Sequence, residues 1–175
     1  MYLKTLSLIN FKNHAEKQFD LNDDINVFVG NNGAGKTNIL DAVNYLSMCK
    51  SFLNSVDKQN IKFDEKFFLI QGNFIKDEKS NQISCGVTFG QKKKFKRNKK
   101  EYDKLADHIG EFPVVVISPY DSNLISEGSE VRRKFIDSII SQYDKKYLAN
   151  LIKYNKVLQQ RNALLKRFQE LRIFE

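Results

Sequence analysis

Residues 25–37 read INVFVGNNGAGKT, an apolar run followed directly by a glycine-rich loop that ends in a lysine and a threonine. The run Ile25–Val29 predicts a buried strand of a parallel or mixed sheet. Apolar residues then recur at helical spacing and predict a helix from residue 36 to about residue 50: Ile39, Leu40, Val43 and Leu46. A strand, a glycine loop and a helix in this order are typical of proteins that bind nucleoside triphosphates.

The loop matches the pattern Gly-x4-Gly-Lys-Thr, and each residue type in it suits phosphate binding. Because glycine has no Cβ, Gly30, Gly33 and Gly35 let backbone N–H groups approach phosphate oxygens closely and form an anion nest. Lys36 is expected to bind the β- and γ-phosphates, and the Thr37 hydroxyl is expected to bind Mg²⁺. The alternative is a glycine-rich turn with an exposed lysine, which the flanking strand and helix disfavour.

Composition indicates a globular chain with an anionic partner. Its 175 residues are 41% hydrophobic, and no stretch approaches the roughly 20 apolar residues of a membrane span. The formal net charge is +8, which nucleic acid would explain, although many basic proteins bind none. Cys49 and Cys85 stand far apart without a Cys-x-x-Cys motif, so we expect two reduced, buried thiols in a cytoplasmic protein and neither a disulfide nor a metal site.

Further strands are predicted on both sides of the loop. Residues 3–10 read as a strand, and Phe19 and Leu21 mark a second short one. Residues 66–76 and 82–89 read as an antiparallel pair joined by a polar loop over residues 77–81. Residues 113–118 form a continuous apolar run that predicts a second buried strand.

Two helices are predicted near the end of the chain. Ser129 is the expected N-cap of a helix over residues 130–141, and Asp144 is the expected cap of a longer helix that continues to residue 175. That helix carries an approximate heptad seam: Tyr147, Leu151, Tyr154, Leu158, Leu165 and Phe168. An amphipathic helix packed on the domain and a protruding coiled-coil-like arm explain this seam equally well.

A basic run occupies residues 92–100, where seven of nine positions are lysine or arginine. Such a run neutralises nucleic-acid phosphates and releases counterions. It is equally typical of a solvated edge hairpin, where lysine blocks pairing with other strands. The candidate DNA contacts are Lys93, Lys94, Lys96, Arg97 and Lys99.

The residues that would complete an ATPase are missing from the sequence. P-loop enzymes place an acidic residue after an apolar strand to hold Mg²⁺ and position water. Here the run at residues 113–118 ends in Ser118-Pro119, and Asp121 lies beyond the proline, so the Walker B acid is absent. No Leu-Ser-x-Gly signature occurs either, and the chain ends inside a predicted helix. We expect an N-terminal part of a longer protein that is not catalytically competent alone.

Four stretches of the sequence resemble the N-terminal part of the RecF family, ABC-type ATPases of DNA repair related to SMC and Rad50. They are residues 6–14, residues 30–42, residues 118–121 together with 128–137, and residues 160–166. The resemblance implies an α/β P-loop NTPase, an ABC-ATPase-like lobe with a mixed β-sheet, an antiparallel subsheet and a C-terminal helical segment that starts an arm. The implied domains are residues 1–128 for the lobe and 129–175 for the truncated arm.

The resemblance also implies a function. It implies a cytoplasmic protein, without a membrane segment, that binds ATP with Mg²⁺ and binds DNA at single-strand gaps and junctions. Such a protein helps RecO and RecR to load RecA, supports the SOS response and dimerises with ATP at full length. The implied ATP-binding residues are Gly30, Asn31, Asn32, Gly33, Ala34, Gly35, Lys36, Thr37 and Asn38, with Lys12 and Asn13 near the base or ribose. The alternatives are a non-catalytic nucleotide- or DNA-binding module and another SMC-like P-loop ATPase.

Four positions in the family-like segments raise specific expectations. Residue 12 is Lys where the family commonly has Arg, which replaces a planar fork by a point charge. Glu130 stands where the family usually has Pro, which affects only the start of a helix. Arg132 and Arg133 are adjacent and point about 100° apart on a helix. We expect one of them to pair with Asp137 or Asp121 and the other to face DNA or a partner.

Overall fold

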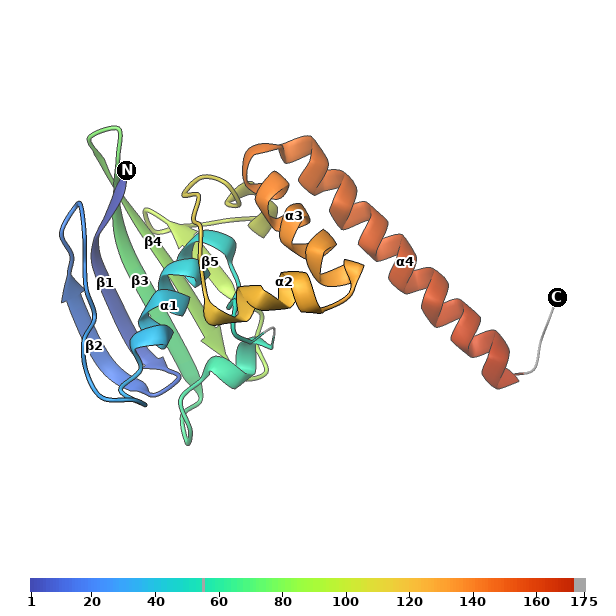
Figure 1. The fold of residues 1–175 in the computed structure, drawn as a ribbon, viewed down its shortest axis with the longest axis horizontal. Coiled ribbons are helices and arrows are strands. Elements are labelled where there is room, and N and C mark those ends of the chain that lie inside the picture. Colours follow the sequence, from blue (N-terminus) through green and yellow to red (C-terminus); the bar gives the residue numbers. More distant parts are fainter. Residues whose placement is uncertain (55, 172–175) are drawn as a thin grey trace. The chain divides into compact units, whose positions relative to one another are not determined.

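The computed structural model describes residues 1–54 and 56–171. Within this part the chain divides into two compact units, Met1–Val116 and Ile117–Glu175. The first unit contains the sheet and α1, and the second contains the long helices (Figure 1). The predicted domain boundary, between residues 128 and 129, lies within the second unit.

A six-stranded antiparallel sheet forms the first unit, in the order β2-β1-β3-β4-β5-β6. Its strands are β1 (Tyr2–Phe11), β2 (His14–Asp20), β3 (Phe67–Lys76), β4 (Lys79–Thr88), β5 (Lys94–Arg97) and β6 (Lys100–Glu101). The strands predicted over residues 3–10, 66–76 and 82–89 are confirmed. The predicted five-residue loop at 77–81 was too long, because Asp77 and Glu78 both adopt positive φ and close the hairpin alone.

One helix, α1 (Lys36–Met48), covers one face of this sheet (Figure 1). Short 3-10 helices follow at η1 (Asp57–Asn60) and η2 (Leu105–Asp107). The helix predicted from residue 36 is confirmed, although Leu40 of its expected apolar face is 48% exposed. In the part of the chain that the structure describes, no helix is both long and apolar enough to cross a membrane.

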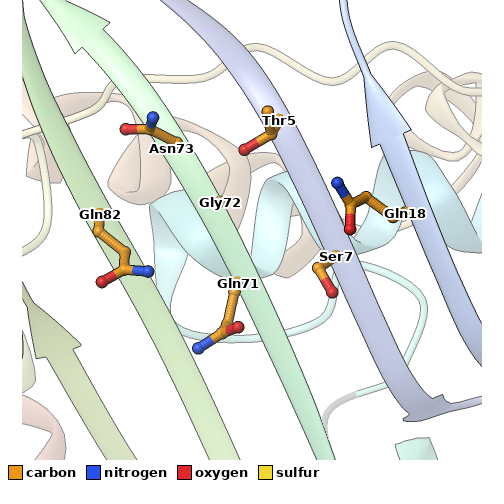
Figure 2. A pocket seen from close by; sticks show the side chains of 7 residues that line it. All are labelled: Thr5, Ser7, Gln18, Gln71, Gly72, Asn73 and Gln82. Atoms are coloured by element: carbon orange, nitrogen blue, oxygen red, sulfur yellow. The ribbon is translucent and has the colours of Figure 1, made fainter.

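The opposite face of the sheet carries polar side chains. A shallow pocket there is lined by Thr5, Ser7, Gln18, Gln71, Gly72, Asn73 and Gln82, with α1 behind the strands (Figure 2). None of these residues is charged. The pocket therefore has no side chain that would neutralise a phosphate, and it is distinct from the glycine loop.

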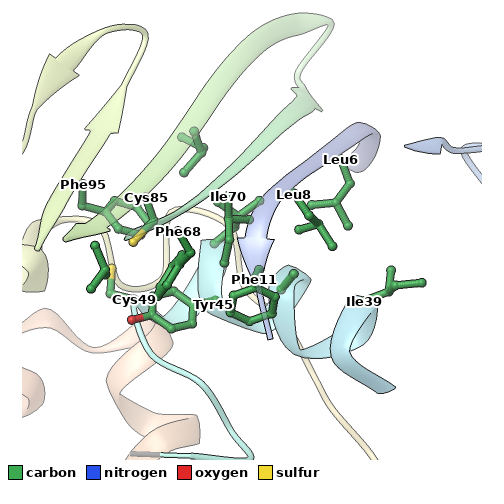
Figure 3. Close-up of a cluster of buried hydrophobic side chains, with 14 of the residues drawn as sticks. Leu6, Leu8, Phe11, Ile39, Tyr45, Cys49, Phe68, Ile70, Cys85 and Phe95 are labelled. Atoms are coloured by element: carbon green, nitrogen blue, oxygen red, sulfur yellow. The ribbon is translucent and has the colours of Figure 1, made fainter. Parts of the chain in front are cut away.

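The core lies between the sheet and α1 (Figure 3). Alternate strand residues such as Leu6, Leu8 and Ile70 are fully buried, as the two-residue period of a strand requires. Gly72 lets the helix approach closely, because a Cβ there would lie 2.5 Å from the Leu46 side chain. The close approach of α1 to β3 therefore depends on a glycine in the strand.

Both cysteines lie in this core as free thiols, as the sequence predicts. Burial raises the pKa of Cys49 to about 12, with Lys93 opposing and Asp57 adding to that effect. Burial also raises the pKa of Cys85. Since the thiolate is the reactive form, neither side chain is suited to nucleophilic chemistry near neutral pH.

The two apolar runs predicted as buried strands are not strands in the described structure. Ile25, Val27 and Val29 are 82%, 76% and 86% exposed, and only Phe28 packs inward, with its ring 5.7 Å from that of Phe19. In residues 113–118, Val115 and Ile117 are each 85% exposed. A strand needs a neighbour for its N–H and C=O groups, and no described strand pairs with either run.

The second unit consists of helices: η3 (Pro119–Ser122), α2 (Asn123–Ser126), α3 (Ser129–Tyr143) and α4 (Lys145–Leu171). Asp144 caps α4 as predicted, since its Oδ1 accepts a hydrogen bond from the Tyr147 N–H at 2.8 Å. The predicted cap at Ser129 is wrong. Gly128 holds the N-cap position, and the Ser129 hydroxyl instead accepts a bond from Arg133.

The predicted seam of α4 is only partly covered in this unit. Leu151, Leu158 and Phe168 are half-buried, whereas Tyr154 is 62% exposed and Leu165 is 47% exposed. The helix continues without interruption to Leu171, and its predicted continuation over residues 172–175 lies outside the described residues.

Candidate functional site

The glycine loop between residues 30 and 35 leads into the N-terminus of α1 and folds around the side chain of Lys36. The Lys36 ammonium donates hydrogen bonds to the carbonyl oxygens of Gly30 at 2.8 Å and Asn31 at 2.9 Å. Within the loop, the Ala34 N–H donates to the Asn31 oxygen at 3.2 Å. A lysine encircled by backbone at a helix N-terminus concentrates positive charge, which favours an anion.

Gly35 holds the N-cap position of α1 in the left-handed region, with φ at 92°. A side chain there would be strained by the backbone alone. It would also collide, because a Cβ on Gly35 would lie 2.5 Å from Asn13 Oδ1 and 2.6 Å from His14 Nε2. Both requirements explain why this position of the loop is glycine.

The β1–β2 turn lies against the glycine loop. Asn13 Nδ2 donates to the Gly33 oxygen at 3.0 Å, and Asn13 Oδ1 accepts a bond from Asn38 Nδ2 at 2.8 Å. His14 Nε2 donates to the Gly35 oxygen at 3.2 Å, since a carbonyl can only accept. His14 was not among the site residues predicted from the sequence. Only its position directly after Asn13 could have indicated that it lies near the loop.

Lys12, predicted near the nucleotide, forms an ion pair inside the protein. Its ammonium lies 2.5 Å from Asp41 Oδ2, and the Asp41 side chain is fully buried on α1. The same carboxylate accepts bonds from the Ser51 hydroxyl at 2.7 Å and the Phe52 N–H at 2.8 Å. Lys12 therefore anchors the β1–β2 turn to α1.

Thr37, the predicted Mg²⁺ ligand, lies exposed in the first turn of α1. No acidic side chain stands in that turn. Among the described residues, no group of three or more histidine, cysteine or acidic side chains forms a metal site. The loop thus offers one hydroxyl oxygen to a cation, and phosphate oxygens would have to supply others.

The basic run forms an edge hairpin of β5 and β6, and its cations fall into two groups. Lys93 is 14% exposed at its side chain and lies 2.8 Å from Asp57 Oδ2. It also donates to the Cys49 oxygen at 2.7 Å. Arg97 pairs with Glu111 at 3.1 Å and donates to the Asn81 side chain. These two cations have protein partners.

The remaining candidate cations of the hairpin face outward. Lys94 and Lys99 are exposed and Lys96 is half-buried. Lys96 lies opposite Ser84 across β4, and Lys94 lies opposite Gly86, so both share the face that carries the polar pocket. The structure thus separates Lys93 and Arg97 from the three lysines that remain accessible to a ligand.

Arg132 and Arg133 lie on α3 in the second unit, where Arg132 binds oxygens of α2 and its C-cap and Arg133 binds an oxygen at the start of α3. Arg132 donates to the carbonyl oxygens of Leu124 at 3.1 Å and Glu127 at 2.9 Å. Arg133 donates to the Ser129 hydroxyl at 2.9 Å. The expected pairing with Asp137 or Asp121 is wrong, because the Asp137 carboxylate instead accepts from the Tyr147 hydroxyl and Asp121 caps Ser118.

Comparison with known proteins identifies relatives of the whole chain. The profile of the AAA ATPase domain family matches residues 1–174. The DNA replication and repair protein RecF of Phocaeicola vulgatus is 53% identical over 171 residues, which cover 97% of this chain and 46% of that protein. The chain thus spans less than half the length of such relatives.

Solved structures show the same similarity. A structure of the recombination mediator protein RecF with ATP, in the RecFOR pathway, is 36% identical, with a TM-score of 0.90 over 97% of this chain and 46% of that one. A structure from work on ATP-driven dimerization and DNA-stimulated activation of SMC ATPases is 20% identical, with a TM-score of 0.62 over 79% of this chain and 99% of that one. The second similarity concerns the fold alone. The two solved structures together confirm the predicted fold class.

Proposed function

The chain belongs to the AAA ATPase domain family and within it resembles RecF, and from this premise we propose that it is the ATP-binding lobe of a RecF-like DNA repair protein. The observation that carries the proposal is the loop at residues 30–35 folded around the Lys36 ammonium at the N-terminus of α1. Phosphate oxygens would replace the two backbone oxygens that Lys36 now contacts. The predicted ATP-binding residues from Gly30 to Asn38 all belong to this loop and helix start.

Thr37 is the residue of the loop that would hold Mg²⁺. Its hydroxyl supplies one hard oxygen ligand, and the cation when bound would neutralise charge on the phosphates. The rest of the coordination would come from phosphate oxygens and water, because the first turn of α1 has no carboxylate. This partial ligand set fits a cation that arrives with its nucleotide.

The exposed apolar runs support the proposal that additional strands, from outside this sequence, complete the sheet of the lobe. Ile25, Val27 and Val29 present alternate side chains to solvent directly before the phosphate loop. Val115 and Ile117 do the same in residues 113–118. Burying such side chains stabilises by about 1.5–3 kcal/mol each, so neighbouring strands would gain much by pairing here. We place those strands in the part of RecF relatives that this chain does not match.

Binding without hydrolysis is the expected behaviour of this chain alone. Turnover needs an acidic residue that positions water, and the nearest sequence candidate, Asp121, instead accepts hydrogen bonds from Ser118. We expect steady-state phosphate release from Mg·ATP to equal that of the Lys36→Ala variant, with and without junction DNA. Release well above that of Lys36→Ala would reveal a catalytic carboxylate and contradict the assignment as an incomplete site.

DNA and repair proteins are the proposed partners. A net charge of +8 exceeds what a nucleotide requires and suits nucleic acid. The similarity to RecF extends the proposal to single-strand gaps and junctions, RecO- and RecR-like partners, RecA loading, the SOS response, ATP-dependent dimerisation at full length, and a cytoplasmic location.

The accessible lysines of the edge hairpin are the proposed DNA contacts. Changing Lys94, Lys96 and Lys99 to Glu should weaken duplex binding and flatten the plot of log affinity against log salt by about 0.9 for each DNA phosphate that is no longer neutralised. Affinity measured by fluorescence anisotropy from low to moderate salt tests this. Lys17, Lys58 and Lys66 are exposed elsewhere in the same unit, so their change to Glu alters net charge equally and should leave the slope closer to that of the unaltered chain. If both triple variants give the same slope of log affinity against log salt, the hairpin lysines are solvated and do not contact DNA.

A further inference from the structure

The β1–β2 turn holds the phosphate loop at positions spread along its length. Asn13 reaches the Gly33 oxygen and the Asn38 side chain, and His14 reaches the Gly35 oxygen. These contacts join segments 20 to 25 residues apart in the sequence, so they are tertiary contacts and contribute nothing to closing the hairpin itself. His14 is only 6% exposed, which holds its imidazole in place.

These contacts orient two peptide units of the phosphate loop. In a trans peptide the carbonyl oxygen and the following N–H point in opposite directions. Holding the oxygen of Gly33 against the turn therefore directs the Ala34 N–H away from the turn, toward the Asn31 oxygen that accepts its hydrogen bond at 3.2 Å and closes the loop. Holding the oxygen of Gly35, which also accepts from the Ile39 N–H at 3.1 Å, directs the Lys36 N–H out of the helix N-terminus.

The turn is itself fixed to the helix that follows the loop. Lys12 pairs with the buried carboxylate of Asp41, and the Lys12 N–H donates to the Asn60 oxygen at 2.8 Å. The turn and the loop also approach so closely that no Cβ fits at Gly35. An anchored element therefore lies directly against the loop.

We propose that Asn13 and His14 are positioning residues that hold the phosphate loop in its phosphate-binding conformation before a nucleotide arrives. The inference rests on the proposed nucleotide binding and adds to it a role for a turn that need not touch the ligand. Preorganisation of this kind raises affinity because less conformational freedom is lost on binding. Asn13, expected from the sequence near the base or ribose, would act through the loop.

Binding measurements on five forms of the chain test the proposal. We expect His14→Ala and Asn13→Ala each to weaken ATP binding about tenfold, and inorganic tripolyphosphate binding by a similar factor, because the defect lies in the phosphate site. His14→Gln should restore binding to within about threefold, since the glutamine Nε2 can donate from a similar place. Lys17→Ala, on an exposed position of β2, should bind like the unaltered chain.

Hydrogen exchange of the nucleotide-free chain provides a second readout that a general loss of stability would not reproduce. In His14→Ala the amides of residues 30–36 should exchange faster while those of β3 and β4 stay protected, and His14→Gln should reverse the change. If the unaltered chain binds ATP and His14→Ala binds it equally tightly, the positioning role is overturned. If the unaltered chain does not bind ATP, the proposed function fails, and unchanged exchange at residues 30–36 would then refute the positioning role separately.

Discussion

Lys36→Ala should weaken ATP binding by about 100-fold or more, the equivalent of about 2.7 kcal/mol, while leaving the fold intact. Among the described residues, the Lys36 ammonium donates hydrogen bonds only to the Gly30 and Asn31 oxygens of its own loop, so the core keeps its packing when Lys36 is changed. The phosphates, in contrast, are left without their one charge-assisted hydrogen bond from a lysine of the loop. Calorimetric titration with ATP measures the loss of affinity, and circular dichroism checks the fold.

Lys50→Ala is the matched control for this change. Lys50 is an exposed lysine just beyond the other end of α1, so its removal alters net charge equally without touching the loop. The control should bind ATP like the unaltered chain. Normal binding by Lys36→Ala would show that the loop does not hold phosphate.

Asp41→Ala should lower the free energy of unfolding by about 3 kcal/mol or more. Its carboxylate is fully buried and satisfies Lys12, the Ser51 hydroxyl and the Phe52 N–H together. Removing it leaves a largely buried ammonium and two donors without their acceptor, and each unmet group costs its desolvation. Urea denaturation followed by circular dichroism measures the change. Asp41→Asn keeps an acceptor oxygen, so its free energy of unfolding should lie between those of the unaltered chain and Asp41→Ala.

Glu111→Ala is the control that isolates burial from charge pairing. Its ion pair with Arg97 lies in the same unit, but the two side chains are 34% and 35% exposed. Such a pair contributes less than about 1 kcal/mol. A destabilisation by Asp41→Ala no larger than that by Glu111→Ala would contradict the anchoring role given to the Lys12–Asp41 pair.

The parts of the fold that the sequence predicted are those set by local pattern. Apolar residues recur at the period of a strand in residues 66–76 and 82–89 and at the period of a helix after the glycine loop. All three predicted elements are present in the structure. The runs Ile25–Val29 and 113–118 are equally apolar, yet their strand state depends on neighbours that local pattern does not encode. Hydrophobicity indicated that these runs need burial and could not indicate what buries them.

The candidate site divides in a similar way. The sequence places Gly30, Lys36 and Thr37 in one loop, because the Gly-x4-Gly-Lys-Thr pattern is local, and their roles in binding stay predictions. The role of His14 was not, since its contact with Gly35 spans 21 residues and depends on how two elements pack. In the basic run, composition treated Lys93 and Lys94 alike, but Lys93, just before β5, pairs with Asp57, whereas Lys94 is exposed.

Phosphate binding by the glycine loop is tested most simply by calorimetric titration of this chain with ATP and, separately, with adenosine in the presence of Mg²⁺. A phosphate-binding lobe predicts saturable binding of one ATP per chain and far weaker binding of adenosine, because the loop and Lys36 would bind phosphate oxygens. The absence of saturable ATP binding, or equal affinity for ATP and adenosine, would contradict the assignment of this chain as an ATP-binding lobe.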